Sequence, residues 1–179
     1  MNKVNLIILI SSIIVFLIIV LFVLFAHLKS KLKYLVYKLD NGYNSIISKL
    51  KEKHEILLRQ INIVETKFKI ESKTFDEIKN IKPDKISFKS DIVLCKCYDE
   101  ILKIKEDRNK TRELKSFRET FDDYNEIELH VVSLRTYYNK NVLELNNLLK
   151  KFPYKLIGNL LKIKAKLLFE GHELTEIID

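Results

Sequence analysis

The sequence contains few of the residues that interrupt helices or build common catalytic centres. Its 179 residues include three glycines, two prolines and two cysteines. Because glycine and proline mark turns and strand ends, their scarcity favours long helices over a sheet. The sequence also lacks a Gly-rich phosphate loop, a G-x-S-x-G elbow and a nucleophile–base arrangement. We therefore expect an all-α protein that is not an enzyme, with no catalytic residue and no cofactor.

Charge is missing from one long stretch, residues 6–26, which reads LIILISSIIVFLIIVLFVLFA. At about 1.5 Å per helical residue, this segment would span about 31 Å, which matches a hydrocarbon core of roughly 30 Å. A cleaved signal peptide has a shorter apolar region that ends at a small-x-small site, whereas Leu24 occupies the place of a small residue here. We expect a transmembrane helix over residues 6–26, after a short flank at 1–5, that contacts bilayer lipid.

Basic residues are distributed unevenly around this segment. Lys3 and the N-terminal amine precede it, whereas four lysines follow it closely, at positions 29, 31, 33 and 38. The positive-inside rule therefore predicts a single-pass protein of the cell membrane, with the N-terminus outside and the C-terminal domain in the cytoplasm. An alternative is that these lysines only form the solvated face of the next helix.

Residues 27–179 have the size of one ordinary domain, which can bury a sizeable core. This part contains 31 basic and all 24 acidic residues, a formal charge of +7 out of +8 for the whole chain. The charges alternate in sign, which favours attraction to anionic lipid headgroups over nucleic-acid binding. RNA-binding motifs and zinc-finger spacing are also missing, so we expect no nucleic-acid partner.

Two long segments show the apolar periodicity of helices that pack in a bundle. In Leu28–Phe68 and Leu114–Phe152, apolar residues recur every three or four positions, and Lys53-His54 is the one polar gap in the first segment. Asp40-Asn41-Gly42 would be a turn signal, but the stripe keeps its phase there, so we expect a continuous helix weakened by about 1 kcal/mol. Pro153 should end the second helix, whose start Asn109 or Thr111 can cap.

The remaining helical signals are shorter. The apolar pattern fades over residues 72–81, Lys82-Pro83-Asp84 predicts a connection, and a helix is expected over about Ser87–Glu106. The C-terminal segment Tyr154–Ile178 could close one end of the bundle. Because both long stripes need an apolar partner, we expect an antiparallel bundle that continues directly from the transmembrane helix.

Cysteine and histidine provide no clear metal site. Cys95 and Cys97 would lie about 200° apart on a helix, so we expect one in the core and the other at the surface, with no metal or disulfide. The histidines are scattered, at His27, His54, His130 and His172. His54 interrupts an apolar stripe, which favours a satisfied, partly buried histidine over a pH sensor.

Charged residues beside the predicted seam are the other candidates. Glu128 and Arg135 could form a buried polar network with Asp40 or Asn41, or they could flank the seam and reach water. The acidic pairs Asp76-Glu77 and Asp122-Asp123 diverge on a helix and should be solvated. We therefore assign no catalytic, metal-binding or cofactor-binding residue.

The C-terminal stretch Leu160–Phe169 interleaves lysines with large apolar residues. It could lie on a membrane surface, or it could be a core-capping segment whose lysines point into solvent. The sequence pattern is consistent with both arrangements.

Three stretches resemble the LemA family of bacterial membrane proteins. The first is Leu39-Asp40-Asn41-Gly42-Tyr43 with Ile46 and Leu50-Lys51, which is similar to a V-D-N-A-W…I…L-K segment. The second is Arg135-Thr136-Tyr137-Tyr138-Asn139 with Val142 and Asn146, together with Glu128 at a matching acidic position. The third is Phe152-Pro153, Leu156-Ile157 and Phe169-Glu170, which is similar to the family's F-P-x-x-L-I…F-F-E ending.

The sequence also departs from the family pattern. Leu58 replaces a proline, Tyr43 replaces a tryptophan, Lys53-His54 disrupts a basic-Tyr run, and residues 82–106 match poorly. The resemblance implies a membrane-anchored antiparallel helical bundle without established enzymatic activity. We expect a scaffold or interaction protein that binds a protein partner or itself; the alternative is a sensory or ligand-binding bundle.

Overall fold

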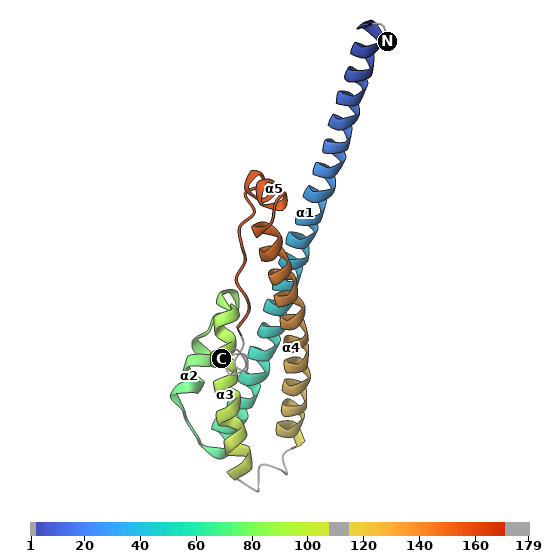
Figure 1. Cartoon of the computed structure of the whole chain (residues 1–179). Helices are drawn as coiled ribbons and strands as arrows, with labels where there is room; N and C mark the ends of the chain where they lie inside the picture. The colour runs from blue at the N-terminus through green and yellow to red at the C-terminus, as the bar shows by residue number, and fades with distance from the viewer. Residues whose placement is uncertain (1–2, 108–114, 171–179) are drawn as a thin grey trace. The chain divides into compact units, whose positions relative to one another are not determined.

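The computed structural model describes residues 3–107 and 115–170, and this part of the chain is all-α, as predicted (Figure 1). Its α-helices are α1 (Lys3–Ile63), α2 (Lys73–Asn80), α3 (Phe88–Asp107), α4 (Lys115–Lys150) and α5 (Tyr154–Leu160). A π-helical turn, Val64–Phe68, follows α1, and a 3-10 turn, Pro83–Lys85, precedes α3. The described residues contain no strand.

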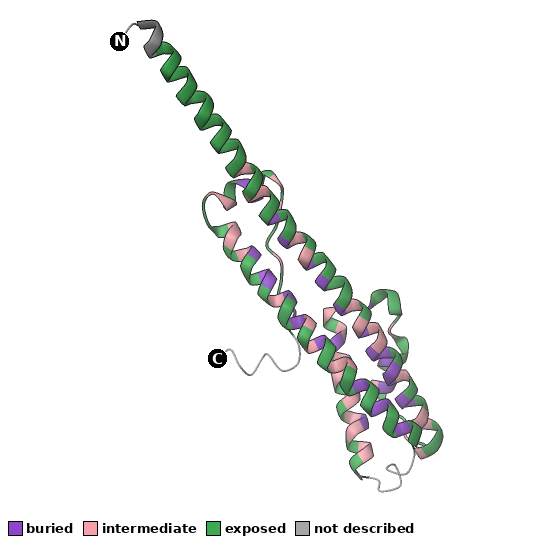
Figure 2. Cartoon of the chain, turned by 90° about the vertical axis from the view of Figure 1, so that its right-hand side faces the viewer, coloured by how far each residue is buried: buried purple, intermediate pink, exposed green. Residues whose placement is uncertain are grey.

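Helix α1 begins as an apolar helix and continues without a break into a packed one. All large hydrophobic side chains from Ile7 to Leu24 are exposed, by 37% at Val20 to 72% at Phe22 (Figure 2). By length and composition, α1 is the one helix in the described residues that could cross a membrane. The helix also passes through Gly42, which confirms that Asn41-Gly42 does not form a turn.

Contacts within the chain divide it into two compact units. Unit 1 comprises Met1–Leu39 and Asn141–Leu167, and unit 2 comprises Asp40–Lys140 and Leu168–Asp179. In unit 1, the buried apolar residues are Leu32, Leu35, Leu39, Val142, Leu145 and Ile157. An exposed ion pair joins Lys31 to Glu144, with 3.7 Å between Nζ and Oε1.

Unit 2 is an antiparallel arrangement of helices around a larger core. Its fully buried apolar residues include Ile46, Leu50, Leu57, Val64, Phe75, Ile78, Leu94, Ile101, Phe117 and Val131. Gln60 donates a hydrogen bond to the Thr120 carbonyl, and Lys53 bonds Glu128. Because the lower-numbered residue of α1 pairs with the higher-numbered residue of α4, these two helices run in opposite directions within the unit.

The boundaries of α3 and α4 agree with the sequence predictions to within two residues. Helix α3 begins one residue after Ser87 and ends one after Glu106, while α4 ends two residues before the predicted Phe152. The predicted caps Asn109 and Thr111 lie outside the described residues. Helix α2 was missed, although the Ser72 hydroxyl caps it by accepting a hydrogen bond from the Thr74 amide at 3.2 Å.

The C-terminal segment Tyr154–Ile178 begins with a short helix, as expected, which ends at Leu160. Residues 163–170 have no regular secondary structure. The backbone groups of Lys166 and Phe169 instead form hydrogen bonds with the side chains of two asparagines of α4. These groups are therefore not available for hydrogen bonds within a helix. The remainder of the predicted segment, 171–178, lies outside the described residues.

Candidate functional site

The most unusual residue of unit 2 is a fully buried lysine on α1. Lys53 has an exposed fraction of 0% and lies between the core residues Leu50 and Leu57. A buried ammonium is costly unless charged and polar groups surround it. The partners of Lys53 therefore define the site.

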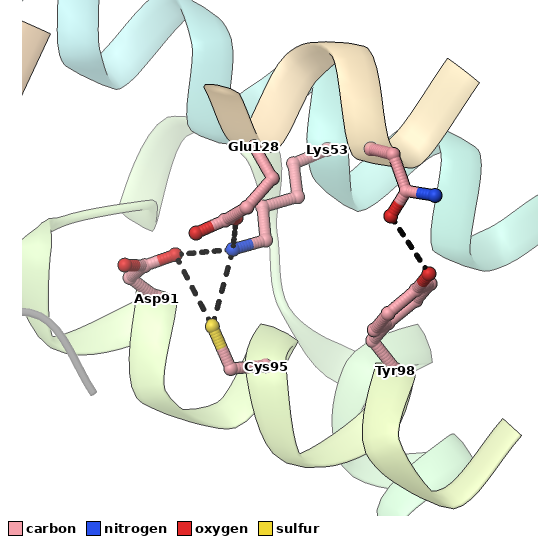
Figure 3. A network of polar contacts seen from close by, with 6 residues as sticks. Lys53, Asp91, Cys95, Tyr98 and Glu128 are labelled. Atoms are coloured by element: carbon pink, nitrogen blue, oxygen red, sulfur yellow. Dashed lines mark hydrogen bonds and ion pairs between the residues drawn. The ribbon is translucent and has the colours of Figure 1, made fainter. Parts of the chain in front are cut away.

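Three side chains from two other helices surround the Lys53 ammonium (Figure 3). Its Nζ lies 2.7 Å from Asp91 Oδ1, 2.5 Å from Glu128 Oε2 and 3.2 Å from Cys95 Sγ. Asp91 and Cys95 are four residues apart on one face of α3, and Glu128 comes from α4. We call Lys53, Asp91, Cys95 and Glu128 the charge cluster.

The charge cluster has one more negative charge than positive charge when both carboxylates are ionised. Burial lowers the pKa of Lys53, but the attraction of the Asp91 and Glu128 carboxylates outweighs burial and raises the pKa above its ordinary value. The Tyr124 ring, 5.2 Å from Lys53 Nζ, adds a cation–π contact. Lys53 therefore stays protonated at neutral pH.

One carboxylate oxygen of the cluster has no partner. Asp91 is 1% exposed, and its Oδ2 atom is buried without a hydrogen bond. Leaving a charged oxygen unsatisfied in the interior costs free energy. The partners of the Lys53 ammonium thus stabilise its charge, whereas one oxygen of the Asp91 carboxylate has no hydrogen bond.

Both cysteine thiols are poorly suited to nucleophilic chemistry. Burial raises the pKa of Cys95 to about 11, although Lys53 acts in the opposite direction, and burial raises the pKa of Cys97 to about 12. The thiolate is the reactive form of cysteine and also the form that binds metal. At neutral pH these side chains are therefore protonated thiols.

Three members of the cluster could contribute to a metal site. One ligand atom each from Asp91, Cys95 and Glu128 lies within 4.8 Å of the others. A thiolate with carboxylates would suit Zn²⁺ better than Mg²⁺. However, the Lys53 ammonium bonds all three residues, so a metal ion would have to displace it and take the proton from Cys95.

A small hollow of about 180 Å³ adjoins the cluster. It is lined by Cys95, Tyr98, Asp99, Tyr124, Asn125, Glu128 and Arg135. The Tyr98 hydroxyl donates a hydrogen bond to Asn125 Oδ1 at 2.9 Å, and its ring stacks on Tyr124 with 3.7 Å between centroids. The Arg135 guanidinium lies 5.8 Å from the Phe169 ring centroid. The hollow thus has aromatic, acidic and basic groups in its wall.

The structure assigns Glu128 a partner other than the predicted ones. Its carboxylate bonds Lys53, a partner that neither alternative had named. The side chain of Glu128 is 30% exposed, whereas Arg135 is only 6% exposed and does not extend fully into water. A polar network beside the seam therefore exists, but it is centred on a lysine that the sequence analysis treated as a gap.

The cysteine and histidine predictions have different outcomes. Cys97 is buried as expected, but Cys95 is not a surface residue, because it contacts Lys53. His54 is 2% exposed and its Nε2 lies 2.9 Å from the Ile78 carbonyl oxygen, which confirms a satisfied, buried histidine. His27 and His130 are exposed, and His172 lies outside the described residues.

The predicted acidic pairs are solvated, as expected. All four side chains of Asp76-Glu77 and Asp122-Asp123 are exposed. Asp123 forms an exposed ion pair with Arg59, at 3.4 Å. These carboxylates therefore do not converge on the charge cluster.

Two asparagines of α4 have a structural role that the sequence analysis missed. Asn146 accepts a hydrogen bond from the Lys166 amide at 3.0 Å and donates one to the Lys166 carbonyl at 2.8 Å. Asn139 makes the same two bonds with Phe169, at 2.8 and 3.0 Å. Each asparagine side chain thus pairs with the backbone N–H and C=O of one residue, as a neighbouring β-strand would. The sequence feature that could have predicted these contacts is the seven-residue spacing of the two asparagines.

The described residues form an all-helical fold in which one helix is suited by length and composition to crossing a membrane. The model of the LemA family matches residues 42–177, which is most of the chain. The chain therefore belongs to the LemA family, as its motifs predicted. No curated protein sequence matches it.

Proposed function

We propose that this chain is a single-pass membrane protein that acts as a non-catalytic scaffold or interaction module at the bacterial cell membrane. The observation that carries the proposal is the continuity of α1, in which the exposed apolar run and the packed residues of unit 2 belong to one helix. The family and the apolar helix fit a membrane-associated helical protein.

The chemistry of the charge cluster supports a non-catalytic role. Lys53 is held by its own counterions, and both thiols are protonated at neutral pH. A general base or nucleophile needs a free proton-accepting group within reach of a substrate. The cluster uses its charges on one another instead.

We propose that unit 2 lies in the cytoplasm, on the basis of the lysines that follow the apolar run. A single cysteine added after Asp179 tests this orientation through labelling by a membrane-impermeant maleimide. The unmodified chain is the background control, because its own thiols are buried or half-buried. Labelling only after the cells are opened is expected; labelling of intact cells would reverse the orientation.

Site-specific crosslinking tests the scaffold role. A photo-crosslinking amino acid placed at Leu129, which is 73% exposed, should give discrete adducts in native membranes. The control is the apolar segment fused to an unrelated soluble domain that carries the same crosslinker. The scaffold proposal fails if the full chain gives neither a partner nor a self-adduct above this control.

A second candidate function is a sensory or ligand-binding bundle. The hollow beside Glu128 and Arg135 and the unpartnered Asp91 oxygen favour this candidate. Calorimetric titration of the full chain with Zn²⁺ provides a direct test, with Glu128→Gln as the matched variant. Binding that the variant loses would support a sensor; a variant that only lowers thermal stability, without any binding by the parent, favours the scaffold.

A further inference from the structure

Unit 1 contains an apolar groove at the end of the apolar run. The groove has a volume of about 690 Å³ and is lined by Leu21, Leu24, Phe25 and Leu28 of α1 and by Phe152, Pro153, Leu156, Ile157 and Leu160. Its wall is almost entirely apolar. We call it the apolar groove.

The second wall of the groove exposes large hydrophobic side chains at regular spacing. Phe152, Leu156 and Leu160 are four residues apart and are 80%, 61% and 68% exposed. Leu156 and Leu160 lie on one side of α5, and Phe152 lies in the turn just before this helix. A short segment that leaves three such side chains in contact with water is typical of a surface that binds an apolar partner.

The position of the groove along α1 indicates which partner covers it. Leu21 to Phe25 form the last part of the run predicted to cross the bilayer, and Leu28 follows it by one turn. At about 1.5 Å per residue, this part of α1 lies within about 10 Å of the end of a 30 Å hydrocarbon span. The apolar surface around α5 is therefore continuous with the surface that the bilayer already covers.

The charge of unit 1 favours a bilayer that contains anionic lipid. Residues 1–39 and 141–167 contain eleven lysines and one acidic residue, Glu144. Lys150, Lys151 and Lys155 flank the exposed apolar side chains of this segment, and all three are exposed. Basic residues beside apolar ones are the pattern of segments that lie in the headgroup region of anionic membranes.

We propose that Phe152–Leu160 is a second membrane contact, in which Phe152, Leu156 and Leu160 insert among lipid acyl chains beside α1. The lysines at 150, 151 and 155 bind anionic headgroups. This proposal adds a lipid-binding surface to the proposed function and rests on α1 crossing the membrane. The proposed contact lies in the segment before Leu160–Phe169, the stretch whose sequence pattern is consistent with a membrane surface.

Tryptophan fluorescence can test the contact, because the sequence contains no tryptophan. The full chain is reconstituted into vesicles of phosphatidylcholine and phosphatidylglycerol, with or without brominated acyl chains as quenchers. Leu156→Trp and Leu160→Trp are the test variants. Phe22→Trp, in the apolar run, is the positive control, and Leu129→Trp, an exposed leucine of unit 2, is the negative control.

The expected result is blue-shifted emission and lipid quenching of Leu156→Trp at least half as strong as that of Phe22→Trp, while iodide quenches only Leu129→Trp. Iodide quenching of Leu156→Trp and Leu160→Trp equal to that of Leu129→Trp would overturn the contact. A blue shift without lipid quenching that disappears on dilution would overturn it in favour of a second copy. If Phe22→Trp is not quenched, the proposed function fails as well.

Charge reversal tests the role of the headgroups. The triple variant Lys150→Glu, Lys151→Glu and Lys155→Glu should reduce lipid quenching of Leu156→Trp by more than half. The matched control reverses three exposed lysines of unit 2, Lys82, Lys85 and Lys89, and should leave the quenching unchanged. Equal quenching in both triple variants would show that anionic headgroups are not recognised.

Discussion

Units 1 and 2 use charge in opposite ways. Unit 1 contains eleven basic residues and one acidic residue, whereas unit 2 contains 21 basic and 23 acidic residues. The ion pair Lys31–Glu144 of unit 1 is exposed by 42% and 46%, but the Lys53–Asp91 pair of unit 2 is exposed by 0% and 1%. Charge in unit 1 is thus available to an outside partner, while the central charges of unit 2 hold its own helices together.

Replacement of the two lysines should give the largest contrast. Lys53→Met leaves Asp91 buried without a counterion, and breaking such a pair costs about 3–5 kcal/mol of unfolding free energy. Lys31→Met removes an exposed pair, which contributes about 0–1 kcal/mol. Chemical denaturation of the detergent-solubilised chain measures both values. Equal losses in the two variants would contradict the proposed difference between the units.

Alkaline pH should destabilise unit 2 through its buried thiols. Since burial raises the pKa of Cys95 to about 11, the unfolded chain loses this proton first as the pH passes about 9. The unfolded state then binds fewer protons, so stability falls with pH between these values, by about 1.4 kcal/mol for each pH unit and thiol. The contribution of the Lys53 ammonium follows the same rule: it is fully present below the ordinary lysine pKa of 10.5 and is lost only as the pH rises above that value.

Unfolding midpoints from pH 8 to 10 measure this effect. Cys95→Ser retains a group that accepts a hydrogen bond from Lys53 but does not titrate in this range. The variant should therefore show a shallower fall in stability than the parent. Identical pH profiles would mean that the Cys95 thiol does not remain protonated in the folded chain.

The two asparagine contacts should differ in strength. Asn139 holds the backbone of Phe169, which is fully buried and stacks on Phe88 with 4.2 Å between ring centroids. Asn139→Ala should cost about 1–3 kcal/mol, because it leaves two polar backbone groups unpaired beside a buried ring. Asn146→Ala acts on the half-buried Lys166 and should cost less.

Hydrogen exchange distinguishes these two losses. The Phe169 amide should lose protection in Asn139→Ala, and the Lys166 amide should lose it in Asn146→Ala. If each variant lost protection at both amides, the two contacts would form one cooperative unit, and the prediction of two local contacts would be wrong.

The smallest predicted effect concerns two helical glycines. A Cβ added at Gly42 would make an ordinary 3.5 Å contact with Tyr138, so Gly42→Ala should stabilise unit 2 by about 1 kcal/mol. A Cβ at Gly158 would lie 2.4 Å from the Leu149 side chain, which must move. Gly158→Ala should therefore bring no gain. Thermal unfolding midpoints compare the two variants directly.

The sequence predicted the long helices because their apolar stripes are long. The stripe kept one phase over about ten turns of α1, so a single Asn-Gly signal at Gly42 did not outweigh it. Helix α2 was missed because only Phe75 and Ile78 of its eight residues are buried. Two residues are too few to define a helical period.

The sequence was less informative about the site, since its geometry depends on residues far apart in the chain. Lys53 read as a polar gap in a stripe, and its partners Asp91 and Glu128 lie 38 and 75 residues away. The backbone contacts of Lys166 and Phe169 depend on side chains 20 and 30 residues away, at Asn146 and Asn139. Periodicity describes one helix at a time and carries no information on such pairs.

The charge cluster also sets the alignment of three helices along their axes. Leucine stripes can slide by one turn and still find apolar contacts, but a slip of about 5.4 Å would separate Glu128 from Lys53. The buried ammonium would then lack half of its counterions, which makes every other register unfavourable. Lys53 therefore fixes the register of α1, α3 and α4 within unit 2. A displacement of one of these helices along its axis requires the other two to move with it.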